Sequence, residues 1–163
     1  MDNYINTYAD TRGLQAQPLT FSEAIVKGIA EGGGLFVPKV LPHLTLDDVC
    51  ELGQLPYARQ AASIYQRFGV DLPRERIEQL TAQAYGSNFD HPAVAPVVEV
   101  APGCHVLELW HGPTSAFKDM ALQCLPVFFS EAVEKLDAGE FLILVATSGD
   151  TGKAALEGFA DRE

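Results

Sequence analysis

The stretch His111-Gly-Pro-Thr-Ser-Ala-Phe-Lys118-Asp119, followed by Ala146-Thr-Ser-Gly-Asp-Thr-Gly152, decides how this chain is interpreted. Each segment is predicted to follow an apolar strand and to open a helix. The amino-terminal ends of both helices should therefore face one crevice at the edge of an α/β sheet, where anions and small ligands bind. The two segments together predict an α/β fold with a ligand site at that crevice.

The lysine segment offers a nucleophile. Lys118 is expected in the first turn of its helix, where the helix dipole and apolar neighbours disfavour the charged ammonium form. A neutral lysine amine forms Schiff bases with carbonyl compounds. Taken alone, a lysine is more often a solvated surface charge, so the neighbouring motif must carry this interpretation.

The second segment offers donors for an anion. Ser148, Gly149, Asp150 and Thr151 combine hydroxyls and free amides at a helix start, which suits a carboxylate or a phosphate. The alternative is a plain N-cap. A nucleotide P-loop is disfavoured, because Thr147 replaces its first glycine and the hydroxyl residue expected after Lys153 is absent.

Residues 1–90 are predicted to form a mostly helical first domain. Capping patterns at Thr20-Phe-Ser-Glu23 and Thr45-Leu-Asp-Asp48 start helices, and two longer helices are expected near 57–68 and 74–85. The first helix should end at Gly32-Gly-Gly34. These glycines follow a helix, which favours a turn over a phosphate loop.

Residues 91–163 are predicted to begin a second domain after a connection rich in Gly, Asn, Asp and Pro. Strands are expected near 94–100, 105–109 and 141–146, with helices from about 116 to 137 and from about 152. The strand-helix-strand order predicts a parallel pair with a right-handed crossover, which would place Lys118 and Ser148 on one rim. Pro126 should kink the first helix. The open apolar sheet edges indicate a fragment.

Composition restricts the partners. The 22 acidic and 11 basic residues give a net charge of −11, which argues against nucleic acid and anionic membranes. No apolar run approaches the roughly 20 residues that cross a bilayer. The amino terminus resembles no secretory signal, so a cytoplasmic location is expected. The cysteines and histidines are too dispersed to predict a disulfide framework or a metal site. They are Cys50, Cys104, Cys124, His43, His91, His105 and His111.

These residues match a known family. The chain resembles the amino-terminal part of threonine synthases, pyridoxal-phosphate enzymes of the tryptophan-synthase-like fold type. Three segments carry the resemblance: Tyr8-Ala-Asp-Thr-Arg-Gly13, the region from Phe21-Ser-Glu-Ala to Gly33-Gly-Leu-Phe-Val-Pro38, and Leu107 to Asp119 together with Ala146 to Gly152. It implies a mainly helical amino-terminal domain, followed by the start of a parallel-sheet, three-layer pyridoxal-phosphate domain.

The resemblance also implies roles for the site residues. Lys118 would hold pyridoxal phosphate as a Schiff base and later move protons. Ser148, Gly149, Asp150 and Thr151 would bind the carboxylate of the amino acid substrate, and Asp150 would also approach the cofactor, although related folds often carry asparagine there. Two local departures are Trp110, where phenylalanine is more familiar, and Lys153, where a small residue is expected.

The implied activity is the last step of threonine biosynthesis, from O-phospho-L-homoserine and water to L-threonine and phosphate. Family members are longer, and place the cofactor-phosphate loop and the group facing the pyridine nitrogen beyond residue 163. The 163 residues alone are therefore expected to be inactive. Two alternatives stay open: another pyridoxal-phosphate lyase of this fold type, and a noncatalytic binding module derived from the family.

Overall fold

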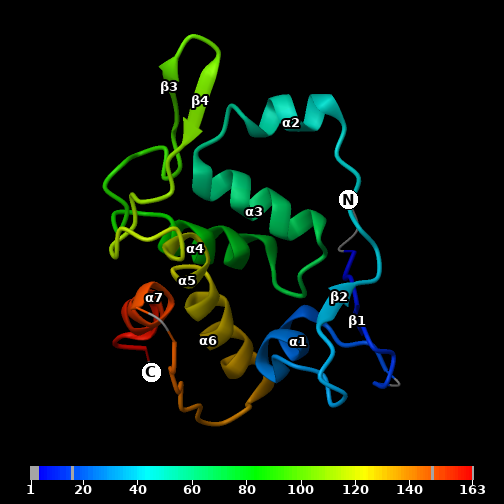
Figure 1. Ribbon diagram of the computed structural model, residues 1–163. Coiled ribbons are helices and arrows are strands. Elements are labelled where there is room, and N and C mark those ends of the chain that lie inside the picture. Colours follow the sequence, from blue (N-terminus) through cyan, green and yellow to red (C-terminus); the bar gives the residue numbers. More distant parts are fainter. Residues whose placement is uncertain (1–3, 16, 148, 163) are drawn as a thin grey trace.

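The computed structural model describes residues 4–15, 17–147 and 149–162. Within these ranges the chain forms helices and two separate two-stranded antiparallel sheets (Figure 1). The elements in chain order are β1 (Tyr8–Asp10), α1 (Phe21–Lys27), β2 (Phe36–Pro38), α2 (Leu46–Leu52), α3 (Tyr57–Arg67), α4 (Arg74–Ala84), β3 (Val97–Ala101), β4 (Cys104–Leu107), α5 (Asp119–Leu122), α6 (Leu125–Leu136) and α7 (Gly149–Phe159).

Both predicted capping boxes are confirmed. At α1, Glu23 N donates to Thr20 Oγ1 at 3.3 Å, and Thr20 N donates to Glu23 Oε2 at 2.8 Å. Thr45 and Asp48 repeat this arrangement at α2. These bonds satisfy amides that have no partner inside the helix.

The predicted end of the first helix is wrong. The helix α1 ends at Lys27 because Gly28 takes a positive φ of 72°, which glycine adopts readily, and its N–H donates to Ala24 O at 2.9 Å. The three glycines at 32–34 instead belong to a turn, in which Gly33 N donates to Ala30 O at 2.8 Å. The interpretation of these glycines as a turn is therefore confirmed.

A hydrophobic core joins the predicted first domain to the helix that follows Lys118. Its buried side chains come from α3, α4 and α6 and the segments beside them. The rings of Tyr65 and Phe128 stack at 4.4 Å, and Phe21 meets both rings edge-on. The core residues are Ala62, Val70, Ile77, Leu80, Ala84, Cys124, Val127 and Phe128. The helix α6 thus completes a core begun by the first 90 residues, and where one domain ends and the next begins stays a prediction.

An ion pair closes the same junction. Lys135 of α6 binds the carboxylate of Asp71, and Asp71 Oδ1 also accepts from Ser22 N at 2.9 Å and from Ser22 Oγ at 3.0 Å. The Asp71 side chain is only 6% exposed. Burial favours its neutral form, but the hydrogen bonds from Lys135 and Ser22 outweigh burial and lower the pKa of Asp71.

The expected parallel strand pair is wrong. The strand β4 pairs antiparallel with β3, with Val97 opposite Leu107, and this hairpin projects from the helices (Figure 1). A short Pro-Gly turn joins the two strands locally, so β4 pairs with its neighbour in sequence. Residues 141–146 are not assigned to a strand, because no other strand in the described part of the chain pairs with them. Leu142 and Leu144 are 82% and 84% exposed.

The helix predicted over 116–137 is broken, as expected from Pro126. It forms a short helix, α5, and a longer one, α6, with Gln123 and Cys124 between them. Pro126 lies in the first turn of α6, where its missing N–H leaves no hydrogen bond unmade. The break lets the two helices take different directions (Figure 1). Among the described residues, no helix has the length and apolar character needed to cross a membrane.

Candidate functional site

The loop before Lys118 is held by a buried carboxylate. Asp119 is completely buried, and its two oxygens accept from Thr114 N at 2.8 Å and Thr114 Oγ1 at 2.7 Å. A Cβ at Gly112 would lie 2.4 Å from Asp119 Cβ, so only glycine fits beside it. Ser115 has φ of 55°, a conformation that costs energy in a residue with a side chain. These contacts fold residues 112–119 into one compact turn.

His111 is bound by a carboxylate at each ring nitrogen. Its Nδ1 lies 2.6 Å from Asp90 Oδ1 and its Nε2 lies 2.7 Å from Glu108 Oε2. Asp90 N also donates to His111 O at 2.9 Å. Hydrogen bonds to Glu108 and then to Asp90 raise the pKa of His111, because they favour the imidazolium. His111 thus fixes the start of the loop, and both of its ring nitrogens are bound by carboxylates.

Lys118 lies immediately before α5 and is half-buried. Its carbonyl oxygen accepts from Ala121 N at 3.1 Å and from Leu122 N at 2.9 Å, which fixes its backbone. Its Nζ lies 4.7 Å from the centre of the exposed Phe117 ring. Lys118 thus combines a partly exposed side chain with a backbone fixed by hydrogen bonds, which suits a lysine that binds a carbonyl compound.

The second motif opens α7. The helix begins at Gly149, three residues before the expected start near Gly152, so Gly149, Asp150 and Thr151 form its first turn. Gly149 and Asp150 are exposed, and Thr151 is half-buried. Ser148, the fourth predicted substrate residue, lies outside the described residues. The amides of a first helical turn have no partner within their helix, which suits the predicted anion-binding role.

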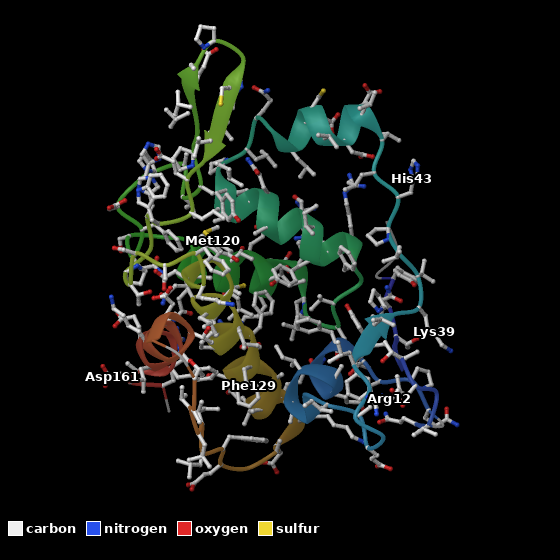
Figure 2. All side chains as sticks on the ribbon, viewed as in Figure 1. Arg12, Lys39, His43, Met120, Phe129 and Asp161 are labelled. Atoms are coloured by element: carbon white, nitrogen blue, oxygen red, sulfur yellow. The ribbon has the colours of Figure 1, made fainter. Side chains whose placement is uncertain are left out.

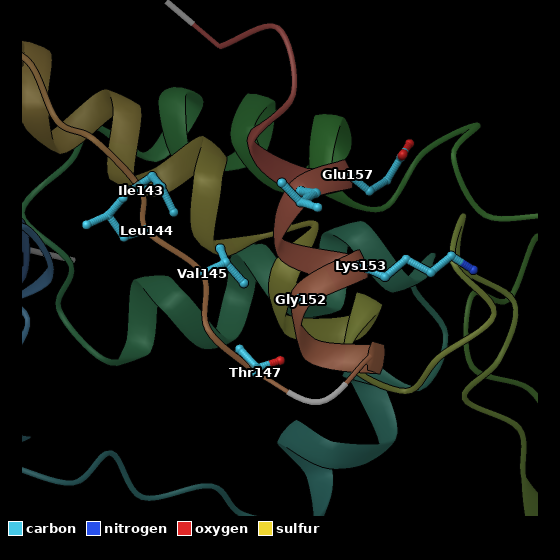
Figure 3. A pocket seen from close by; sticks show the side chains of 8 residues that line it. Ile143, Leu144, Val145, Thr147, Gly152, Lys153 and Glu157 are labelled. Atoms are coloured by element: carbon cyan, nitrogen blue, oxygen red, sulfur yellow. The ribbon is translucent and has the colours of Figure 1, made fainter.

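The helices α5 and α7 pack backbone against backbone, which brings the two motifs to adjacent elements. A Cβ at Gly158 of α7 would lie 1.9 Å from Leu122 O of α5. A second connection runs from Lys153 of α7, whose Nζ donates to Thr114 O at 3.0 Å. Figure 3 shows the Lys153 side chain extending from α7 on the side away from Val145. The lysine loop and the first turns of α7 are thus tied together.

Two cavities lie beside α7. One, of about 710 Å³, lies between α7 and residues 143–147 (Figure 3). The other, of about 1100 Å³, lies between α4, α6, α7 and residues 139–145. Phe129, labelled in Figure 2, lines the larger cavity, and its ring packs edge-on against Phe141 and Phe159. Lys118 lines neither cavity, so both lie apart from the predicted reactive amine.

The residues that hold the loop before Lys118 could not be identified from the sequence alone. Asp119 reads as an ordinary acidic residue in a first helical turn, and its burial depends on Thr114 and Gly112 folding over it. Lys153 is a departure from the family pattern, and in the structure its side chain bridges the two motifs. The spacing of Gly112, Thr114 and Asp119 was the available signal for a tight turn.

The described residues fit the attachment of an aldehyde cofactor but supply few contacts for the rest of it. A half-buried lysine stands on a fixed backbone, and its helix packs against a helix whose first-turn amides have no partner within that helix. Within residues 4–15, 17–147 and 149–162, no group of three His, Cys, Asp or Glu side chains could hold a metal ion.

Comparison with known proteins identifies the relatives of this chain. The family model described as "Threonine synthase N terminus" matches residues 7–85. The threonine synthase of Pseudomonas aeruginosa is 40% identical over 153 residues, covering 93% of this chain and 32% of that protein. Human "Threonine synthase-like 1" is 41% identical over 143 residues, covering 86% of this chain and 19% of that protein.

Solved structures give the same result for the fold. The structure of PLP-bound threonine synthase from Brucella melitensis matches with a TM-score of 0.89 and 38% identity, over 97% of this chain and 34% of that chain. Yeast threonine synthase matches with a TM-score of 0.80 and 32% identity, over 94% of this chain and 33% of that chain. These matches confirm the predicted α/β fold class. The chain spans about one third of these two structures.

Proposed function

We propose, from the premise that this chain is the amino-terminal region of a threonine synthase family member, that it carries the reactive lysine of a threonine synthase. The reaction converts O-phospho-L-homoserine and water into L-threonine and phosphate. The observation that carries the proposal is the packing of α5 on α7, which sets the helix after Lys118 against the helix that opens with Gly149.

Each site residue receives a role from its chemistry. The amine of Lys118 would hold the cofactor and then, once released, take and return protons at the substrate carbons. The Thr151 hydroxyl and the first amides of α7 would hold the substrate carboxylate, together with the Ser148 hydroxyl. Asp150 would approach the cofactor ring. Pyridoxal phosphate supplies an electron sink that makes the protons beside the substrate amine acidic.

The test is replacement of Lys118 in a full-length protein that carries this chain. Lys118→Ala should abolish the borohydride-stable attachment of pyridoxal phosphate and lower turnover of O-phospho-L-homoserine by roughly 100-fold or more, because the amine is both the anchor and the proton carrier. Lys27→Ala is the matched control, since Lys27 is an α1 residue paired with Glu31. Attachment is measured by peptide mass spectrometry, and turnover by phosphate release.

Retention of both attachment and turnover by Lys118→Ala would contradict the proposal. A wild-type protein that attaches the cofactor but turns over a different amino acid would favour another lyase of the same fold type. A wild-type protein that neither attaches the cofactor nor releases phosphate would support a noncatalytic module.

A further inference from the structure

Thr114 uses all of its polar groups to connect three parts of the site. Its N–H and its hydroxyl donate to the two oxygens of Asp119 at 2.8 and 2.7 Å, and its carbonyl accepts from Lys153 Nζ at 3.0 Å. Thr114 is only 6% exposed, and Asp119 is fully buried. Because a buried carboxylate without donors is costly, the Thr114–Asp119 pair holds one conformation.

Lys118 lies inside the turn that this pair closes. Thr114 precedes it by four residues, and Asp119 follows it directly. On the other side, the Lys118 carbonyl is bound by the amides of α5. The Lys118 backbone is therefore fixed from both directions, and the freedom left to its amine is that of the side chain alone.

Lys153 fastens the closed turn to the other motif. It extends from α7, one turn after the predicted carboxylate-binding residues, and reaches the Thr114 carbonyl on the lysine loop. A movement of Thr114 would thus disturb the conformation of the loop and also its placement against α7. Effective positioning of a reacting group depends on distances of this order, and small displacements cost large factors in rate.

We propose that Thr114 is a positioning residue for Lys118, acting through Asp119 on the loop and through Lys153 on α7. This inference rests on the proposed function, because it concerns the amine that would hold the cofactor. Thr114 itself touches neither cofactor nor substrate in this role. Its contribution is to hold the Lys118 backbone in one place relative to α7, whose first-turn residue Asp150 would approach the cofactor ring.

The experiment compares two lysines in a full-length protein that carries this chain. With pyridoxal phosphate as the probe, an amine condenses with the aldehyde, water leaves, and borohydride reduces the resulting C=N bond to a stable secondary amine. Peptide mass spectrometry gives the ratio of initial labelling rates at Lys118 and Lys27. Lys27, paired with Glu31 at 3.3 Å, reports the reactivity of a lysine far from the loop along the chain.

The variants form a matched set. Thr114→Val keeps the shape of the side chain but removes the hydroxyl donor, whereas Thr114→Ser keeps the donor. Thr114→Val should lower the Lys118-to-Lys27 ratio roughly tenfold, the size expected for one lost hydrogen bond to a charged group, and Thr114→Ser should stay within about twofold of wild type. Lys153→Met should lower the ratio by about threefold and Lys153→Arg should restore it.

Circular dichroism and the urea midpoint decide whether Thr114→Val is folded. If it is not, Lys153→Met and Lys153→Arg provide the test, because Lys153 is exposed and its replacement disturbs the fold less. If Thr114→Val is folded and keeps the wild-type ratio of labelling rates, the positioning role is overturned and the proposed function stays intact. If Thr114→Val does not fold, a wild-type ratio in Lys153→Met has the same meaning. A wild-type full-length protein in which Lys118 reacts no faster than Lys27 would overturn both.

Discussion

His111 controls the start of the lysine loop through its charge. Two carboxylates face its ring nitrogens, and the hydrogen bonds to Glu108 and Asp90 raise its pKa above the ordinary value of 6.5. The folded chain therefore binds this proton more tightly than the unfolded chain does. Its contribution to stability is fully present below pH 6.5 and is lost as the pH rises through the raised pKa of the folded state.

The His111 variant should remove this pH dependence. As the pH rises from 6.5 through the raised pKa of the folded state, the stability of the wild type should fall relative to that of His111→Gln, because glutamine carries no proton to lose. Urea unfolding at a series of pH values measures the difference. His43→Gln, which changes an exposed histidine, should follow the wild type. Parallel curves for wild type and His111→Gln would contradict the assignment.

Single residues were predictable where chemistry is local to the sequence. Lys118 and Thr151 could be proposed from their motifs alone, and their roles stay predictions. The partners of His111 could not, since Asp90 lies 21 positions away and meets it only after the chain folds. The role of Thr114 was hidden for the same reason: its partner Asp119 is close in sequence, but the burial that makes the pair strong comes from other elements.

The contact between α5 and α7 is the element-scale feature on which the site depends. Gly158 allows the two backbones to meet, because its missing side chain leaves room for the Leu122 carbonyl. Small residues at helix contacts allow such close approach, and any larger residue must push the helices apart.

Gly158→Ala should separate the two helices. The added methyl group would lie 1.9 Å from Leu122 O and 3.1 Å from Pro126 Cγ. We expect a loss of about 1 to 3 kcal/mol in unfolding free energy, although alanine favours helix by about 1 kcal/mol over glycine. Urea unfolding provides the measurement. Gly149→Ala, where a Cβ meets nothing within 4 Å, should be neutral or stabilising. Equal stability of the two variants would show that the contact is not tight.

Helices and strands were predictable where neighbouring residues determine them, and were not predictable where a distant part of the chain does. The two capping boxes set the starts of α1 and α2, and Pro126 set the break before α6. Strand pairing failed as a prediction because it depends on a partner elsewhere in the chain. Residues 141–146 have the composition of a buried strand, yet in the structure they lie beside α7 with every second side chain largely exposed.

At the scale of the whole molecule, α6 joins the helices before residue 90 to the segment that follows it. Phe128 stacks in the core of the helical part, and Lys135 binds Asp71 and Ser22 at the end of the same helix. The Lys135 side chain is 37% exposed, whereas the Asp71 side chain is 6% exposed. The carboxylate therefore has less access to water and needs the lysine as a partner more than the lysine needs the carboxylate.

Lys135→Met should therefore destabilise the whole chain. It leaves the Asp71 carboxylate buried with only the Ser22 donors, and we expect a loss of about 1 to 3 kcal/mol, less than for a fully buried pair because the lysine is partly solvated. Lys27→Met removes the exposed pair with Glu31 and should cost less than about 0.5 kcal/mol. Thermal and urea unfolding of both variants give the comparison. Similar losses would contradict a special role for the junction.

The share of the core that α6 provides also bears on how the protein is made. Helices α1, α3 and α4 leave the ribosome well before Cys124, Val127 and Phe128 do, and until then the apolar faces that these residues cover stand open to solvent. Folding during synthesis must therefore wait for residues that belong, by sequence, to the next domain. A nascent chain that stalled near residue 90 would expose the apolar side chains that Cys124, Val127 and Phe128 cover in the folded chain, and it would become a target for chaperones and proteases.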